Sequence, residues 1–178
     1  MTNEIFTFKA QDCGRLNALQ DIYHYAVLHH RAIIPVEGDC MEGLDIEDGG
    51  CVAVDFTRYP RPGRRENGVY VSGDPCICWA QPPSASRPSL MCKQYTCVWR
   101  GHEVGTRYKQ VEGQPFRMNY GFPAILILGV VYASWSKDGS LLWERDPEIF
   151  PESLPDHCTI ESGGSIDVGE VYEYHERD

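Results

Sequence analysis

The chain has 178 residues, of which 42% are apolar, and it carries a formal net charge of -10. This length and composition predict a single domain with a hydrophobic core and exclude a disordered polymer. Residues 146–178 hold ten acids against one arginine, so the acidity belongs to the C-terminal end. The molecule as a whole has no field that attracts nucleic acid or anionic lipid, and nucleic-acid binding is not expected.

The N-terminal residues lack the basic and long apolar regions of a signal peptide. The longest apolar run, residues 122–135, is too short to span a bilayer. We therefore expect a cytoplasmic protein without membrane contacts. Its eight cysteines are then expected to be reduced thiols rather than a disulfide framework.

Residues 1–32 are predicted to form an N-terminal arm and one amphipathic helix. Between residues 15 and 30, apolar side chains recur at helical spacing, at Leu16, Leu19, Tyr23, Ala26 and Val27. A helix-turn-helix module needs at least two packed helices, so a DNA-reading domain is not predicted. The adjacent His29 and His30 fall on different faces of the helix and make a poor joint ligand set.

Residues 33–145 are predicted to form a mostly β domain. Short apolar runs alternate with turns rich in glycine, proline and charge, a pattern typical of a coiled, barrel-like sheet. Two loops, 58–67 and 81–88, are expected to be exposed connections. The expected strands are 33–36, 51–56, 69–72, 76–80, 90–99, 104–112 and 125–135, with a turn at 137–139 and a return strand at 141–143.

Residues 146–178 are predicted to form an acidic tail. Three prolines and three glycines interrupt this segment, so we expect an extended, partly ordered chain whose Val171, Tyr172 and Tyr174 could form one edge strand. Such a tail could bind a protein partner, although charge runs are usually just solvated.

The most specific pattern is Gly38-Asp39-Cys40-Met41, which precedes an acidic glycine turn and an alternating apolar strand. Two more segments follow in order: residues 91–95, Met-Cys-Lys-Gln-Tyr, and residues 128–132, Leu-Gly-Val-Val-Tyr. Together they resemble the LexA/UmuD family of self-cleaving regulators over residues 33–143. Cys40 stands where that family has its nucleophilic serine, and Lys93 stands at the position of its catalytic lysine.

The resemblance implies a coiled, barrel-like β fold of the LexA/signal-peptidase type, with one helix before it and the acidic tail after it. It also implies a homodimeric regulator, related to prophage or stress responses, that cleaves its own chain without metal or organic cofactor. As in UmuD, the missing DNA-reading domain points to protein partners.

The resemblance further assigns roles to individual residues. Cys40 would be the nucleophile and Lys93 the base, while backbone N–H groups around Asp39, Cys40 and Met41 would form the oxyanion site. The family's scissile bond joins a small residue or cysteine to glycine, which makes Cys13–Gly14 a candidate cleavage site. The alternative is that Gly14 is simply the turn before the helix.

A cysteine–lysine pair has its own proton balance. Lysine acts as a base only when neutral, and burial beside Met91 and Tyr95 on one strand face disfavours the ammonium form. A thiol is a stronger acid than an ammonium group in water, so the pair could also rest as thiolate and ammonium and stay nucleophilic. A second interpretation remains open: a catalytically silent dimerisation and interaction module, in which Cys40 is a small buried residue and Lys93 an exposed strand lysine.

Two other clusters compete for a functional role. Cys76, Cys78, Cys92 and Cys97 could in principle bind zinc, but their spacing does not form tight knuckles, and buried strand cysteines are the better explanation, so no metal site is predicted. Arg58, Arg61, Arg64 and Arg65 form a basic loop with Tyr59 that could contact nucleic acid or the chain's own acidic tail. A solvated loop is the simpler interpretation.

Overall fold

The computed structural model describes residues 6–7, 28, 30–98 and 101–155. This part is mostly β, which confirms the predicted class, and it includes the short 3-10 helices η1 (Glu42–Leu44) and η2 (Pro147–Ile149). The predicted helix over 15–30, apart from residues 28 and 30, lies outside the described residues, as do Cys13–Gly14 and the tail beyond residue 155. No helix in the described part is long and apolar enough to cross a membrane.

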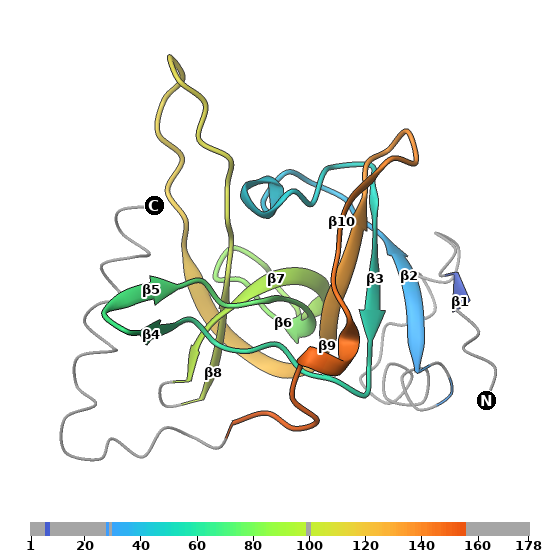
Figure 1. Cartoon of the computed structure of the whole chain (residues 1–178). Coiled ribbons are helices and arrows are strands. Elements are labelled where there is room, and N and C mark those ends of the chain that lie inside the picture. Colours follow the sequence, from blue (N-terminus) through green and yellow to red (C-terminus); the bar gives the residue numbers. More distant parts are fainter. Residues whose placement is uncertain (1–5, 8–27, 29, 99–100, 156–178) are drawn as a thin grey trace, which may run out of the picture.

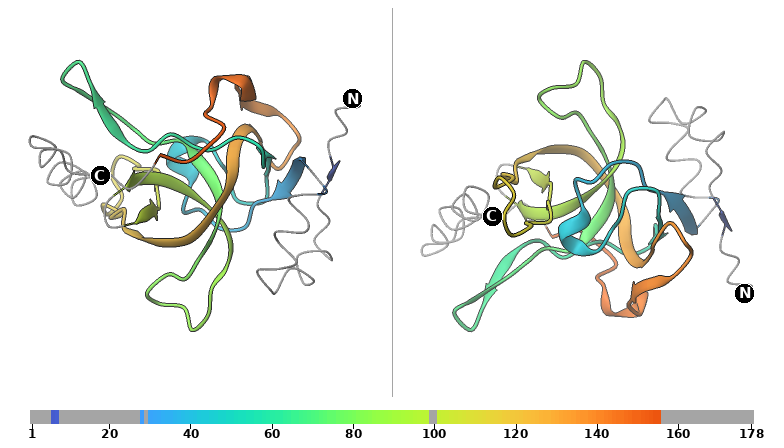
Figure 2. Two further views of the ribbon diagram at one scale, coloured as in Figure 1. Left: turned by 90° about the horizontal axis from the view of Figure 1, so that it is seen from below. Right: turned by 90° about the horizontal axis from the view of Figure 1, so that it is seen from above.

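The strands form one large coiled sheet and one small ribbon (Figure 1). In chain order they are β1 (Phe6–Thr7), β2 (Arg31–Pro35), β3 (Cys51–Asp55), β4 (Arg64–Glu66), β5 (Val69–Val71), β6 (Pro75–Ala80), β7 (Ser89–Val98), β8 (His102–Gly105), β9 (Gly121–Trp135) and β10 (Leu141–Glu144). The sheet order is β1-β2-β3-β9-β6-β7-β8, and β10 pairs with β9. Because β8 also pairs with β9, the strands β9, β6, β7 and β8 close into a small barrel, which Figure 2 shows from below and above.

β9 connects the two halves of the sheet. It runs for 15 residues and pairs with β3, β6, β8 and β10. Residues 127–134 are buried without interruption, which explains why they read as a continuous apolar run instead of an alternating one. A Cβ at Gly129 would lie 2.4 Å from the carbonyl oxygen of Asp55, so glycine permits the close approach of the end of β3. β9 thereby joins the β2–β3 pair to the barrel.

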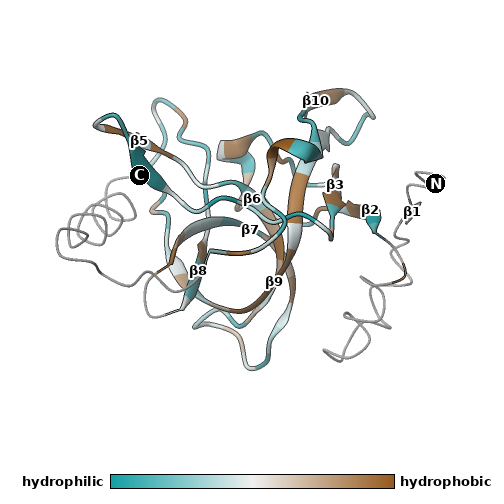
Figure 3. Cartoon of the chain, turned by 60° about the horizontal axis from the view of Figure 1, so that its bottom comes forward, coloured by the Kyte–Doolittle hydropathy of each residue, from teal (hydrophilic) through white to brown (hydrophobic). Residues whose placement is uncertain are grey.

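Two main apolar clusters stabilise this arrangement by removing apolar surface from water. The first packs residues of β2, β3 and β6 against the segment after β2, and includes Met41, Val52, Ile77 and Trp79. The second involves β6, β7, β8 and β9, and includes Cys76, Cys78, Tyr95, Val104 and Phe122. Figure 3 shows apolar residues along β2, β3 and β9. The two clusters lie on different sides of β6, so the segment that carries Cys40 is anchored to the sheet from one side.

The predicted strand over 104–112 is shorter in the structure, because β8 ends at Gly105. Residues 106–120 form a projecting arm, hereafter the 106–120 arm (Figure 1). Side chains replace a backbone ladder in it: Asn119 Oδ1 accepts from the Tyr108 amide at 2.7 Å, and Gln110 Oε1 accepts from the Arg117 amide at 3.1 Å. The arm is therefore an ordered excursion between β8 and β9, although it is not a strand pair.

The loop predicted at 58–67 also differs, since it contains β4, which pairs with β5. The packed body extends past the predicted boundary at residue 145. Phe150 is buried, its carbonyl oxygen accepts from Arg58 Nη1 at 3.0 Å, and the Tyr59 amide donates to the Pro151 carbonyl at 2.9 Å. The burial of Phe150 and these hydrogen bonds anchor residues 146–155, the first part of the predicted acidic tail, to the body.

Candidate functional site

The segment between β2 and η1 presents Cys40 on a tightly held turn. The Val36 amide donates to the Gly50 carbonyl at 2.9 Å, and the Gly49 amide donates to the Val36 carbonyl at 3.0 Å. Gly38 has φ +90°, a conformation that favours glycine, and its amide donates to Asp48 Oδ1 at 2.8 Å. These local bonds fix the shape of the turn.

Met41 anchors the turn from the other side of Cys40. Its side chain is 1% exposed and belongs to the first apolar cluster, while the side chain of Cys40 is half-buried and packs against that cluster. The Leu44 amide donates to the Met41 carbonyl at 3.0 Å and closes η1. Met41 is thus a structural support, and the neighbouring thiol is left at the surface of a groove.

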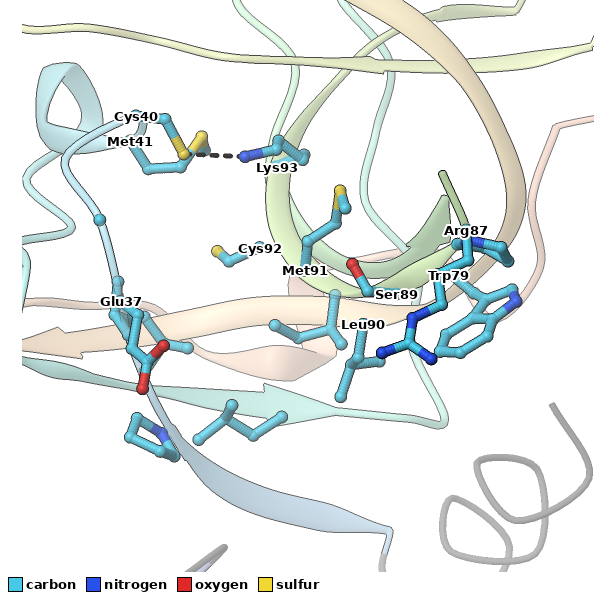
Figure 4. A pocket seen from close by; sticks show the side chains of 17 residues that line it. Glu37, Cys40, Met41, Trp79, Arg87, Ser89, Leu90, Met91, Cys92 and Lys93 are labelled. Carbon is cyan, nitrogen blue, oxygen red and sulfur yellow. Dashed lines mark hydrogen bonds between the residues drawn. The ribbon is translucent and has the colours of Figure 1, made fainter. Parts of the chain in front are cut away.

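Lys93 reaches this thiol from β7. The strand is paired in register with β6, with Lys93 opposite Cys76. Its side chain is buried, with 9% of the residue exposed, and its Nζ lies 2.8 Å from Cys40 Sγ (Figure 4). The two residues are 53 positions apart in the sequence, and the structure brings them into direct hydrogen-bond contact.

Among the described residues, no carboxylate forms an ion pair with the Lys93 amine. An amine in hydrogen-bond contact with a thiol can exchange a proton with it, so the pair has two forms, amine with thiol and ammonium with thiolate. In the first state the amine can remove the thiol proton, and in the second the nucleophile is already formed.

The same turn offers backbone donors. Within the described part of the chain, no group accepts a hydrogen bond from the amides of Cys40 or Met41, whereas the amide of Glu42 donates to the Asp39 carbonyl at 3.2 Å. Unpaired N–H groups next to a nucleophile can donate to the oxygen that becomes negative during acyl transfer. The turn can supply both the nucleophile and the donors.

A groove of about 490 Å³ leads away from the Cys40–Lys93 pair. Ile34, Val36, Val52 and Ile77 contribute apolar lining, and Figure 4 shows Arg87 beside Trp79 at the end remote from the pair. β8 pairs with β7 only from residue 94 onward, so residues 89–93 have one edge without a strand partner in the described structure. Such an edge can hydrogen-bond an extended peptide.

The 106–120 arm supports the turn, and the motifs give no indication of this role. The Arg107 amide donates to the Cys40 carbonyl at 2.7 Å, and the Arg107 carbonyl accepts from the Gly43 amide at 2.8 Å. Arg117 pairs with both carboxylate oxygens of Asp39, with Nη2 at 3.3 Å from Oδ1. The hydrogen bond from Arg117 holds the pKa of Asp39 below its ordinary value. These contacts join segments about 70 residues apart, so local spacing could not reveal them.

The remaining cysteines have a different character. Burial, the largest cause, raises the pKa of Cys92 to about 12, and it also raises the pKa of Cys97 to about 12. Cys76 and Cys78 are buried in the second apolar cluster. In residues 30–98 and 101–155, no group of three or more potential ligands is arranged to hold a metal ion. Cys76 and Cys78 are therefore core residues, whereas the half-buried Cys92 lines the same groove as Cys40, and Cys40 is the thiol in contact with the Lys93 amine.

The basic loop is engaged with acids of its own chain. Arg58 Nη2 lies 2.9 Å from Glu148 and 3.3 Å from Glu152, both in the segment predicted as the start of the acidic tail. Arg61 Nε lies 2.9 Å from the buried carboxylate of Asp74. These arginines therefore attach residues 146–155 and the turn before β6 to the body.

Of the predicted site residues, the structure brings Asp39, Cys40, Met41 and Lys93 together. Cys13 and Gly14 lie outside the described residues. Comparisons with models of protein families, with curated proteins and with solved structures each found no match to this chain.

Proposed function

We propose that this protein is a LexA/UmuD-like regulator in which Cys40 and Lys93 cleave a peptide bond of the chain's own N-terminal segment. The observation that carries the proposal is the 2.8 Å contact between the thiol and a buried lysine that has no carboxylate partner among the described residues. The coiled β fold and the order of the three motifs support the family. A cytoplasmic homodimer with a role in prophage or stress responses belongs to the same proposal.

The chemistry proceeds as acyl transfer. Lys93 accepts the proton of Cys40, and the thiolate attacks the carbonyl carbon of the scissile peptide. The amides of Cys40 and Met41 donate to the oxyanion of the tetrahedral intermediate. The ammonium of Lys93 then protonates the departing amine, and a C–N bond breaks to leave a thioester. Water, deprotonated by the neutral amine, hydrolyses this thioester and regenerates the thiol.

The position of β1 supports an N-terminal substrate. β1 runs parallel to β2, with Thr7 level with Ile33, so the chain leaves β1 in the direction in which β2 leads to Cys40. This pairing places Phe6–Thr7 beside the strand that leads to Cys40, which favours Cys13–Gly14, ahead of β2 in the sequence, as the scissile pair.

Intact-mass measurement tests the proposal directly. The purified chain is incubated over a range of pH, and two fragments that together account for the chain are expected from cleavage near Gly14. Cys40→Ala and Lys93→Ala should abolish the fragments, whereas Cys40→Ser, which carries the family's own nucleophile, should retain them. Lys137→Ala, at an exposed lysine, is the matched control.

If the rate constant of fragment formation does not change when the protein is diluted, cleavage occurs within one molecule. Absence of fragments from the parent protein, or an equal yield from Lys93→Ala, would reject the peptidase. The alternative would then hold: a catalytically silent dimerisation and protein-interaction module on the same fold.

A further inference from the structure

The 106–120 arm exposes apolar side chains at its outer part. Val111, Phe116 and Met118 are 46%, 56% and 60% exposed. The arm is nevertheless ordered by its own hydrogen bonds, which include the pair between Gln110 and Arg117 and the bond from the Gln114 amide to the Val111 carbonyl at 3.1 Å. An ordered projection that holds apolar side chains in water is typical of an interaction surface.

The charge of the arm is opposite to that of the molecule. The arm holds Arg107, Lys109 and Arg117 against the single acid Glu112, whereas the chain as a whole has a net charge of -10. Lys109 is exposed, and no acid of the described residues forms an ion pair with it. The arm therefore suits an occupant that combines carboxylates with apolar side chains.

The C-terminal end of this chain has that chemistry. Residues 156–178 carry seven acids against one arginine, and apolar or aromatic residues lie between the acids at Ile166, Val168, Val171, Tyr172 and Tyr174. The described chain ends at Pro155, one residue after Leu154, which packs against the barrel cluster that also contains Val104 and Phe122. The 23 remaining residues span at most about 75 Å when extended, which is ample for a projecting loop of 15 residues.

We propose that the 106–120 arm is the docking surface for the acidic C-terminal segment, residues 156–178, of the same chain. The carboxylates meet Lys109, and the interspersed apolar side chains cover Phe116 and Met118. Other occupants fit less well. The arm of a second copy would bring like charges together, and an anionic lipid surface would repel a protein of net charge -10.

The oxidation of Met118 by peroxide, followed by peptide mass spectrometry on the full-length protein, tests this contact. Met118 should react several-fold faster when the tail loses charge through Glu170→Gln, Glu173→Gln and Glu176→Gln in one protein. Lys109→Gln should produce the same acceleration from the other side of the contact. High salt should do so in the parent protein, because salt screens exposed ion pairs.

The matched control removes three exposed acids elsewhere, through Glu47→Gln, Glu66→Gln and Glu144→Gln, and should leave the Met118 rate unchanged. The buried Met41 reports unfolding in every variant, so the ratio of Met118 to Met41 oxidation is compared. Equal ratios in the parent, the tail variant and Lys109→Gln would overturn the proposal. If the protection of Met118 from oxidation falls when the parent protein is diluted, the proposal is also overturned, because the occupant of the arm would then be a second molecule.

Discussion

Two buried charged side chains on neighbouring parts of the sheet have opposite environments. Asp74, which directly precedes β6, is 3% exposed and meets Arg61 Nε at 2.9 Å and Arg145 Nη1 at 3.3 Å. Lys93, on the adjacent β7, is 9% exposed and has the thiol of Cys40 as its polar contact. Burying a charge costs several kcal/mol unless partners compensate for it. Two guanidinium groups therefore compensate the charge of Asp74, whereas no carboxylate of the described residues pairs with the Lys93 amine.

The largest expected effect separates the thiols by their environment. At pH 8 the burial-raised pKa of Cys97, about 12, leaves about one part in ten thousand as thiolate. We expect iodoacetamide to alkylate Cys40, whose sulfur contacts the Lys93 amine, many-fold faster than Cys97. Peptide mass spectrometry after timed alkylation measures both rates. Lys93→Met should slow the alkylation of Cys40 and leave that of Cys97 unchanged, and comparable rates at the two cysteines in the parent would contradict the contrast.

A second measurement compares the stability of the two charged sites. Asp74→Ala should lower the free energy of unfolding by about 2 kcal/mol, less than for a fully buried pair because both arginines can reach solvent. Lys93→Met should leave that free energy unchanged or raise it, because it replaces an uncompensated polar group with an apolar one. Urea unfolding of both variants checks this order. A larger loss in Lys93→Met would show that the lysine supports the fold.

The smallest expected effect concerns the arm. Arg117→Ala should return the pKa of Asp39 upward to its ordinary range, because the hydrogen bond that lowers it is lost. A depressed pKa in the folded state means that the interaction stabilises above the unfolded carboxyl pKa of about 4 and is lost as the pH falls through the folded value. An NMR titration of Asp39 in the parent and in Arg117→Ala measures the shift, with Lys137→Ala as the control. An unchanged titration of Asp39 in Arg117→Ala would show that the ion pair between Arg117 and Asp39 does not lower the pKa of the carboxyl group.

Periodicity and turn chemistry predicted much of the sheet. The apolar runs at 51–56, 76–80, 90–99 and 125–135 correspond to β3, β6, β7 and β9 within a few residues, because alternation and β-branched content are local properties. The run at 104–112 predicts a longer strand than β8, because side-chain hydrogen bonds within residues 106–120 take the place of backbone strand pairing. β4 was missed because its three residues, Arg64–Glu66, have no apolar alternation.

The candidate site was likewise predictable only where it depends on local motifs. The spacing of Gly38, Asp39 and Cys40 and the strand around Lys93 could be interpreted from the sequence, since each is a short motif. The support from Arg107 and Arg117 could not, because it depends on an arm that folds back across about 70 positions. Likewise, Phe150 resembles any aromatic residue in an acidic segment until its burial and its contact with Arg58 are known.

By itself, the sequence determined the mostly β class, the position of the Gly-Asp-Cys-Met turn and the strand that carries Lys93, since these follow from local conformational preference and apolar pattern. Only the tertiary structure decided that the Lys93 amine lies 2.8 Å from the Cys40 sulfur, at the end of a groove and without a competing carboxylate among the described residues. The reason is physical: the coiling of the sheet around β9 sets distances between residues far apart in the chain, and no local pattern encodes that curvature.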